Sequence, residues 1–381
     1  MQIKKMTGIM CPPISERINM EANIEITYMT WSDVVGLTPL TENLQNAIKY
    51  NKISHAYLIQ GERLSGKRML ADIFARALQC EGDRAPSEYQ ATLFDLETEK
   101  RDKSVKMRPC NQCRSCKQAI NKNHPDIIYV THEKPNVISV DNIRQQVNAD
   151  IGIKPYSGDY KIYIIDEAEK MNVQAQNALL KTLEEPPGYA VILLLVTRAE
   201  TMLQTILSRC VVLNIKPVPE NLIKQYLMQR VQVPDYRAAV CASFARGNVG
   251  RAIELASNKL FDQMKSSVLD LLRHISDMEL NQIVSEVKKI TEEKFDTNDY
   301  LDLCYIWFRD VLLLKASGVS DSQTNLIFKE HLTDVAKAAE YYSYERIEKI
   351  IHSIDVARNR IAANVNFDLT MELMFFEMKA G

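Results

Sequence analysis

The chain has 381 residues, with 47 basic and 49 acidic side chains and a net charge of −2. Hydrophobic residues make up 46% and charged residues 25%, as in globular proteins, which excludes wholesale disorder and a polybasic coat for nucleic acid. This length predicts about two or three domains with separate cores. Only 12 glycines and 13 prolines occur, well below the usual shares of about 7% and about 5%, which favours long helices over collagen-like, all-β or linker-rich architectures.

No stretch of the sequence approaches the run of about 20 apolar residues that a membrane-spanning helix needs. The N-terminal residues also lack the apolar run and small-residue cleavage site of a secretory signal. We therefore expect a cytoplasmic protein with no membrane partner, whose cysteines are reduced or bound to metal. Residues 1–28 show no sustained period, so we expect an N-terminal extension there, with Met20 or Met29 as an alternative start.

Short apolar runs alternate with helix-like segments in the N-terminal part of the chain. Runs rich in branched and aromatic residues predict strands at 56–59, 127–130, 161–165, 191–196 and 211–213. Helical patterns lie between them at 68–78, 140–148 and 173–183. This alternation is typical of a parallel sheet with helices on both faces. After Pro217 and Pro219 apolar residues recur only at helical spacing, which predicts a helical C-terminal third.

A phosphate-binding loop follows the first predicted strand. Residues 61–67 read Gly-Glu-Arg-Leu-Ser-Gly-Lys and match G-x-x-x-x-G-K between a strand and a helix. In such a loop the backbone from Gly61 to Gly66 cradles phosphates, and Lys67 neutralises them. The next residue should be Ser or Thr to hold magnesium, but it is Arg68, which cannot ligate a cation. The pattern therefore predicts either a degenerate site for ATP and magnesium or a purely structural turn.

An acidic pair, Asp166 and Glu167, follows the predicted strand 161–165. Beside a phosphate loop, one carboxylate suits magnesium and its neighbour suits orienting or deprotonating water. An acidic pair after a strand can also simply begin a helix. Together with the loop, the pair favours a remnant of a nucleotide site.

Four of the eight cysteines are clustered: Cys80, Cys110, Cys113 and Cys116. Four thiolates are the ligand set of a closed, structural zinc site, while an iron–sulfur cluster, another metal or free thiols are alternatives. A catalytic C-x-x-C pair is disfavoured because the segment does not begin a redox-type βαβ unit. His124 and His132 are expected to be ordinary loop residues. The polar segment 81–109 is expected to be a mobile surface excursion.

These motifs stand in a fixed order together with His55–Leu58, Asn123–Asp126, Asn177–Pro187 and Ile206–Cys210. In that order they resemble the clamp-loader subunits of bacterial DNA polymerase III, which belong to the AAA+ class. The resemblance is dense from 31 to about 252 and looser at 307–310 and 364–369. It implies an α/β AAA+ (P-loop NTPase-like) core at 29–214 with a zinc-binding insertion at 80–116, a small helical lid at 215–262, and an all-α collar for oligomerisation at 263–381.

The resemblance also assigns roles to single residues. Arg209, within Ser208-Arg209-Cys210, would enter the ATP site of a neighbouring subunit as an arginine finger. Thr197 would be a polar sensor, and Arg251 would be a second sensor directed at phosphates. Arg68 departs from the ATP-hydrolysing gamma/tau members, whose loop ends in Gly-Lys-Thr. It favours the delta-prime type, in which hydrolysis is absent or unneeded.

The implied function is DNA replication as part of an assembly. The subunit would join gamma/tau and delta subunits in a hetero-oligomeric ring that opens a sliding clamp and places it on primed DNA. It would have no polymerase activity and little or no ATPase activity of its own. Two alternatives remain: a gamma/tau-like subunit that hydrolyses ATP, and a zinc-containing nucleic-acid-binding protein. The near-zero net charge and the lack of a dense Lys/Arg stripe disfavour the second.

Overall fold

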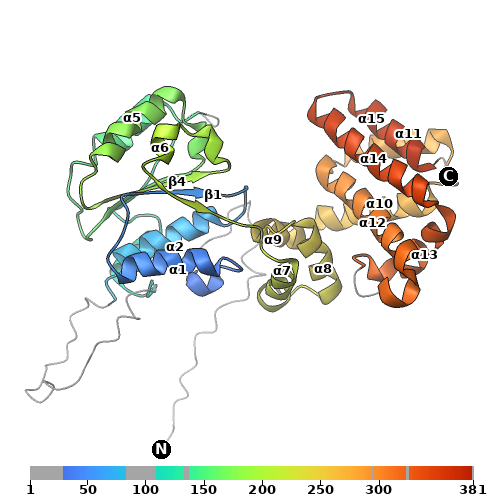
Figure 1. The fold of residues 1–381 in the computed structure, drawn as a ribbon, viewed down its shortest axis with the longest axis horizontal. Coiled ribbons are helices and arrows are strands. Elements are labelled where there is room, and N and C mark those ends of the chain that lie inside the picture. Colours follow the sequence, from blue (N-terminus) through green and yellow to red (C-terminus); the bar gives the residue numbers. More distant parts are fainter. Residues whose placement is uncertain (1–28, 83–108, 133–136, 294, 323–325, 380–381) are drawn as a thin grey trace, which may run out of the picture. The chain divides into compact units, whose positions relative to one another are not determined.

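The computed structural model describes residues 29–82, 109–132, 137–293, 295–322 and 326–379 (Figure 1). The predicted extension 1–28 and most of the predicted excursion 81–109 lie outside these residues. The chain divides into two compact units. The first contains the described residues up to Leu222 together with Gly247–Arg251, and the second contains Ile223–Arg246 and the residues from Ala252 onward.

The first unit is built on a five-stranded, entirely parallel sheet with the strand order β2-β3-β4-β1-β5. The strands are β1 (Ala56–Gln60), β2 (Ile127–Tyr129), β3 (Lys161–Ile165), β4 (Ala190–Val196) and β5 (Val211–Asn214). All residues of β3 and β4 are buried, as expected for central strands covered on both faces. The predicted parallel sheet and its strands are confirmed.

Helices cover both faces of this sheet. The helices α1 (Thr38–Lys49) and α2 (Lys67–Gln79) lie on one face, and α5 (Val173–Glu184) and α6 (Gln204–Leu207) lie on the other (Figure 1). The short helix α4 (Val140–Ile143) continues as a π-helical turn over Arg144–Asn148 and packs against α5. Successive side chains of a strand point to opposite faces of the sheet, so each strand packs against the helices on both sides. Leu58 joins the core beneath α4 and α5, whereas the Tyr57 ring contacts the Phe74 ring of α2 at 5.3 Å.

A buried carboxylate organises the loop before β3. Asp126, with 1% of its surface exposed, accepts hydrogen bonds from the backbone N–H groups of Tyr156, Ser157 and Gly158 at 2.6, 2.8 and 3.2 Å. Burial alone would raise the pKa of Asp126. The backbone and hydroxyl donors outweigh that effect, so its pKa is lowered from the usual value.

Replacing Asp126 by asparagine should therefore lower the free energy of unfolding by about 2 kcal/mol at neutral pH, the scale of hydrogen bonds to a charged group. A lowered folded-state pKa stabilises the protein above the unfolded-state pKa of about 4, and this stabilisation is lost as pH falls through the folded-state pKa. Chemical denaturation of both proteins should show the difference shrinking in acid. A difference that stays constant with pH contradicts this account.

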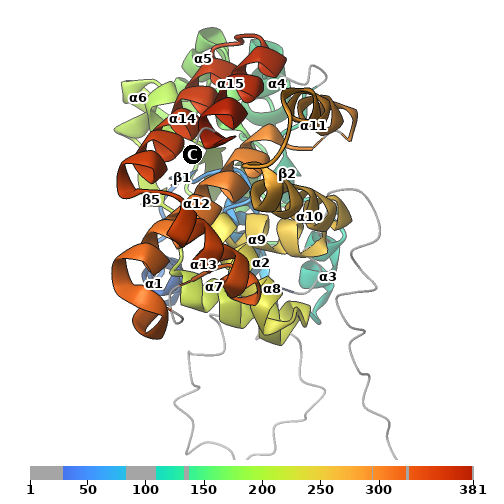
Figure 2. The same cartoon turned by 90° about the vertical axis from the view of Figure 1, so that its right-hand side faces the viewer.

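The second unit is helical throughout its described residues (Figure 2). Its helices are α7 (Glu220–Tyr226, begun in the first unit), α8 (Asp235–Phe244), α9 (Val249–Ser257, also begun there), α10 (Lys259–His274), α11 (Leu280–Glu292), α12 (Thr297–Ser322), α13 (Leu332–Tyr341), α14 (Tyr344–Ala362) and α15 (Phe367–Lys379). The long helix α12 packs against α10, α13 and α14. The buried Asp302 of α12 accepts bonds of 2.6 Å from both Arg246 and Arg358. The predicted helical C-terminal region is confirmed, and none of the described helices is long and apolar enough to cross a membrane.

Candidate nucleotide site and metal centre

The structure shows why glycine occupies positions 61 and 66 of the phosphate loop. A Cβ atom on Gly61 would lie 2.5 Å from the Ser65 hydroxyl, which is closer than atoms approach, so a side chain does not fit there. Gly66 is the N-cap of α2 and has a φ of 89°, in the left-handed region that glycine adopts without strain. The loop therefore turns tightly from β1 into α2.

The N-terminus of α2 carries unpaired donors. Gly66 offers no side-chain cap, and within the part of the chain that the structure describes the backbone N–H groups of Lys67, Arg68 and Met69 have no acceptor. The Lys67 side chain is buried, and its ammonium donates to the carbonyl oxygens of Gly61 at 2.8 Å and Glu62 at 3.3 Å. Burial lowers the pKa of Lys67, and nearby carboxylates partly offset this shift.

Arg68 lies in a cluster of side chains from α2, β2 and the end of β3. Its Nη1 atom is 2.7 Å from Asp166 Oδ2, and its Nε atom is 3.5 Å from Asp72 Oδ2. The guanidinium also lies 4.7 Å from the centre of the Tyr129 ring, whose hydroxyl donates to Asp72 Oδ1 at 3.0 Å. Asp72 and Tyr129 thus hold the guanidinium against Asp166.

The residues of this loop do not fit a magnesium ion. Magnesium requires oxygen ligands at about 2.1 Å in octahedral geometry, but Asp166 Oδ2 holds Arg68 and Asp166 Oδ1 accepts the backbone N–H of Glu167 at 3.0 Å. The residue after Lys67 has no hydroxyl, and the positive charge of Arg68 beside Asp166 repels a divalent cation. The Glu167 carboxylate is 2.5 Å from the Lys170 ammonium.

Thr197 lies directly after β4 at the same edge of the sheet. Its hydroxyl donates to Glu169 Oε1 at 2.6 Å, and its backbone N–H donates to the same atom at 3.2 Å. Among the carboxylates near Lys67, that of Glu169 has the largest effect on the lysine pKa. Sequence reasoning missed Glu169, because a third acid shortly after Asp166 looks like part of a helix start.

The segment before Arg251 packs on the phosphate loop. The Asn248 side-chain amide donates to the Arg63 carbonyl at 2.7 Å, and its oxygen accepts the Arg251 backbone N–H at 3.1 Å. A Cβ atom on Gly250 would lie 2.2 Å from the Leu64 carbonyl oxygen, so only glycine fits. The structure therefore brings Arg251 near the loop through Asn248 and Gly250, neither of which the sequence analysis had given a role.

Arg209 lies elsewhere, after the C-terminus of α6. Its Nη2 atom is 3.0 Å from Glu184 Oε1 at the end of α5. Its Nη1 atom donates to the Thr205 carbonyl at 2.8 Å and to the Ser208 hydroxyl at 3.2 Å. These contacts use three of the five guanidinium N–H groups, and the side chain is 35% exposed. The remaining N–H groups have no acceptor in the described chain.

The predicted cysteine cluster forms in the structure. The sulfur atoms of Cys80, Cys110, Cys113 and Cys116 all lie within 4.8 Å of one another, and those of Cys110 and Cys116 are 3.9 Å apart. A tetrahedral zinc site with Zn–S bonds of about 2.3 Å separates its sulfurs by about 3.8 Å. The donor set therefore fits a thiolate-binding metal ion.

Backbone hydrogen bonds reach three of the four sulfurs in this cluster. The backbone N–H groups of Cys110, Cys113 and Cys116 donate to the sulfurs of Cys80, Cys110 and Cys113, each at 3.3 Å. A hydrogen bond from the Cys116 thiol lowers the pKa of Cys80 to about 5. Burial raises the pKa of Cys113, and the hydrogen bond to Cys80 raises that of Cys116. Metal ligation requires deprotonated sulfur, which these contacts favour at Cys80 alone among the three.

The cluster is joined to the C-terminal end of α2. Cys80 is the C-cap of that helix and Cys113 is the N-cap of α3 (Arg114–Ile120). The Ser115 hydroxyl donates to the Gln79 carbonyl at 2.6 Å and contacts His124 Nε2 at 3.0 Å, while His124 Nδ1 accepts the Asp126 N–H. Burial lowers the pKa of His124, so the neutral ring has a structural role in this loop.

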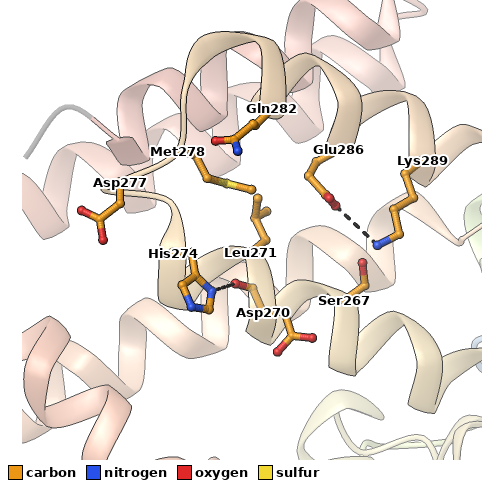
Figure 3. Close-up of a pocket in the computed structure, with 9 residues that line it drawn as sticks. All are labelled: Ser267, Asp270, Leu271, His274, Asp277, Met278, Gln282, Glu286 and Lys289. Atoms are coloured by element: carbon orange, nitrogen blue, oxygen red, sulfur yellow. Dashed lines mark hydrogen bonds and ion pairs between the residues drawn. The ribbon is translucent and has the colours of Figure 1, made fainter.

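The second unit carries an open pocket of about 390 Å³ between α10 and α11 (Figure 3). Acidic side chains line it, including Asp277 and Glu286, and Glu286 pairs with Lys289 at 3.7 Å. The His274 ring contacts the Asp270 carbonyl at 2.9 Å. None of the residues that the sequence analysis selected lies in this pocket, and its contacts indicate no ligand.

Comparison with known proteins decides the family. The family described as "DNA polymerase III, delta subunit" matches residues 36–219. The DNA polymerase III subunit delta' of Bacillus subtilis is 25% identical over 358 residues, which cover 93% of this chain and 99% of that protein. Together, these matches support a DNA polymerase III clamp-loader subunit. The resemblance read from the motifs is thereby confirmed.

Other DNA polymerase III subunits are also similar to this chain. The tau subunit of Bacillus subtilis is 29% identical over 308 residues, or 75% of this chain, and the match covers 50% of the tau subunit. This chain therefore spans about half the length of that relative. A solved structure of a gamma-subunit-related protein from Thermotoga maritima covers 89% of the chain at 21% identity with a TM-score of 0.38.

Proposed function

We propose that this clamp-loader subunit is of the delta-prime type and performs little or no ATP hydrolysis itself. The observation that carries this proposal is the ion pair between Arg68 and Asp166 at 2.7 Å. It replaces the magnesium that phosphoryl transfer needs to offset charge on the phosphates. The match to 99% of the delta' subunit also supports it.

In this proposal the chain works through its neighbours. It joins gamma/tau and delta subunits in a ring, with 29–214 as an AAA+ core, 215–262 as a lid and 263–381 as a collar. The ring opens a sliding clamp and places it on primed DNA. The chain supplies Arg209 to an adjacent ATP site, where the two guanidinium N–H groups without an acceptor in the described chain would contact the phosphate.

We also assign zinc to the cysteine cluster. All four donors are sulfur, which fits zinc, and a closed set of four leaves no open position for catalysis. The role is structural: the metal would hold the segment on either side of the 81–109 region against the end of α2.

The purified chain should release almost no phosphate from ATP, because Arg68 occupies the metal position beside Lys67. The measurement is steady-state phosphate release with magnesium, using a gamma/tau subunit as the positive control. Turnover comparable to that control contradicts the delta-prime assignment and supports a gamma/tau-like function, for which the identity to the tau subunit over 75% of the chain is the argument.

Co-purification with gamma/tau and delta subunits, with measured stoichiometry, tests the assembly.

A further inference from the structure

We propose that the Arg68 guanidinium takes the place of the magnesium ion in this phosphate loop, so that the loop binds a nucleoside polyphosphate without metal. This goes beyond the loss of hydrolysis, because a site without the hydroxyl that binds magnesium could also have lost its ability to bind nucleotide. The contacts of the loop argue for a site that retains an anion and has exchanged one cation for another.

The charge of Arg68 lies beside both Lys67 and Asp166. Arg68 follows Lys67 in the first turn of α2. Its Nη1 atom lies 2.7 Å from Asp166 Oδ2, an oxygen atom that would otherwise be available to a metal ion. A guanidinium is always charged and presents N–H groups in a planar fork that matches phosphate oxygens. It can therefore hold the carboxylate and still offer donors to a phosphate.

The neighbours of Arg68 hold it in place against competition from magnesium. Its guanidinium packs on the Tyr129 ring and is paired with Asp72, which is only 8% exposed. Moving Arg68 out of the site would also separate its guanidinium from the buried Asp72 carboxylate, and breaking such a buried ion pair is costly in free energy. The metal-free arrangement is thus the one that the surrounding side chains stabilise.

The loop also presents several donors that the described chain leaves without acceptors. The first-turn N–H groups at Lys67, Arg68 and Met69 have no acceptor among the described residues. The buried Lys67 ammonium contacts only carbonyl oxygens, and no carboxylate of the described chain pairs with it within 4.0 Å. The Ser65 hydroxyl is also buried without a partner there. Two cations, free donors and a helix N-terminus together suit phosphate groups.

The test is a fluorescence titration of the full chain with MANT-ADP and MANT-ATP, in EDTA and in excess magnesium. In EDTA we expect saturable binding of at least one analogue. Excess magnesium should weaken that binding by about tenfold, because the metal competes for the phosphates by mass action. Binding that requires magnesium, or no saturable binding in EDTA, overturns the proposal.

Two variants make the test specific to Arg68. Arg68→Thr should lose metal-free binding at least tenfold and gain a dependence on magnesium. Asp166→Asn keeps the guanidinium, so the binding that remains should stay independent of magnesium, whereas a magnesium site would be destroyed by it. Arg198→Thr is the matched control, since Arg198 is exposed after Thr197 and forms no ion pair in the described chain. Circular dichroism verifies the fold of each variant.

The outcomes separate this proposal from the proposed function. Binding that depends on magnesium in Asp166→Asn, or metal-free binding that persists in Arg68→Thr, contradicts the exchange of cations. Clamp loading by the reconstituted complex is measured in parallel and does not depend on nucleotide in this subunit. A complex that loads clamps although the chain binds no analogue would remove the metal-free site and leave the delta-prime role standing.

Discussion

Arg209→Ala is expected to lower the ATPase and clamp-loading rates of the reconstituted complex while the variant folds and assembles normally. A guanidinium at a neighbouring γ-phosphate offsets charge that develops in the transition state, an effect of about 10³ to 10⁵ in rate at a single site. The total loss should be smaller, because several ATP sites share the work of the ring. Lysine should substitute poorly, since it lacks the planar fork.

Stability must be measured beside activity, because Arg209 also forms a local ion pair. Its 3.0 Å contact with Glu184 joins two partly exposed side chains, and such surface pairs contribute about 0–1 kcal/mol. Arg209→Ala should therefore leave thermal unfolding almost unchanged. Arg198→Ala, another surface arginine of the first unit, is the control. Full activity of a correctly assembled Arg209→Ala complex would remove this residue from the mechanism.

The strands could be predicted because their local pattern is strong. Continuous apolar runs such as 161–165 and 191–196 are buried on both faces, and burial of that kind requires helices on each side. The loop glycines and the four cysteines were also readable, because spacing alone restricts what such residues do. The structure brings the four sulfurs together although Cys80 and Cys110 are far apart in sequence.

The partners of the site residues could not be predicted, because they come from distant segments. The sequence shows that Arg68 replaces a hydroxyl, but only the fold shows that its guanidinium meets Asp166, 98 residues away. Asn248 bonds to Arg63 across 185 residues. His124 looked like an ordinary loop residue, yet it is 4% exposed and bonded at both ring nitrogens. Such contacts depend on tertiary packing rather than on periodicity.

Loss of the zinc that we assign to the cysteine cluster should destabilise the C-terminal end of α2. We expect one zinc ion per chain by elemental analysis, lost in the double variant Cys113→Ser and Cys116→Ser. Binding of structural zinc contributes about 10–16 kcal/mol in zinc-finger peptides, and here the cluster caps α2 and begins α3. The double variant, or chelation of the native chain, should therefore lower the thermal midpoint and loosen the C-terminal end of α2, seen as faster hydrogen exchange there.

A cysteine outside the cluster provides the control for this experiment. Cys210→Ser removes a thiol outside the cluster and should keep the full zinc content. Because Ser115 and the Arg76–Asn111 contact of 3.2 Å also hold α3 and its preceding turn to α2, the sheet should survive metal loss and the unfolding defect should be confined to this end of the first unit. If elemental analysis finds iron and the protein absorbs visible light, the cluster is assigned to iron–sulfur and not to zinc. A metal-free native chain with unchanged stability and unchanged exchange at α2 would end the structural-metal assignment.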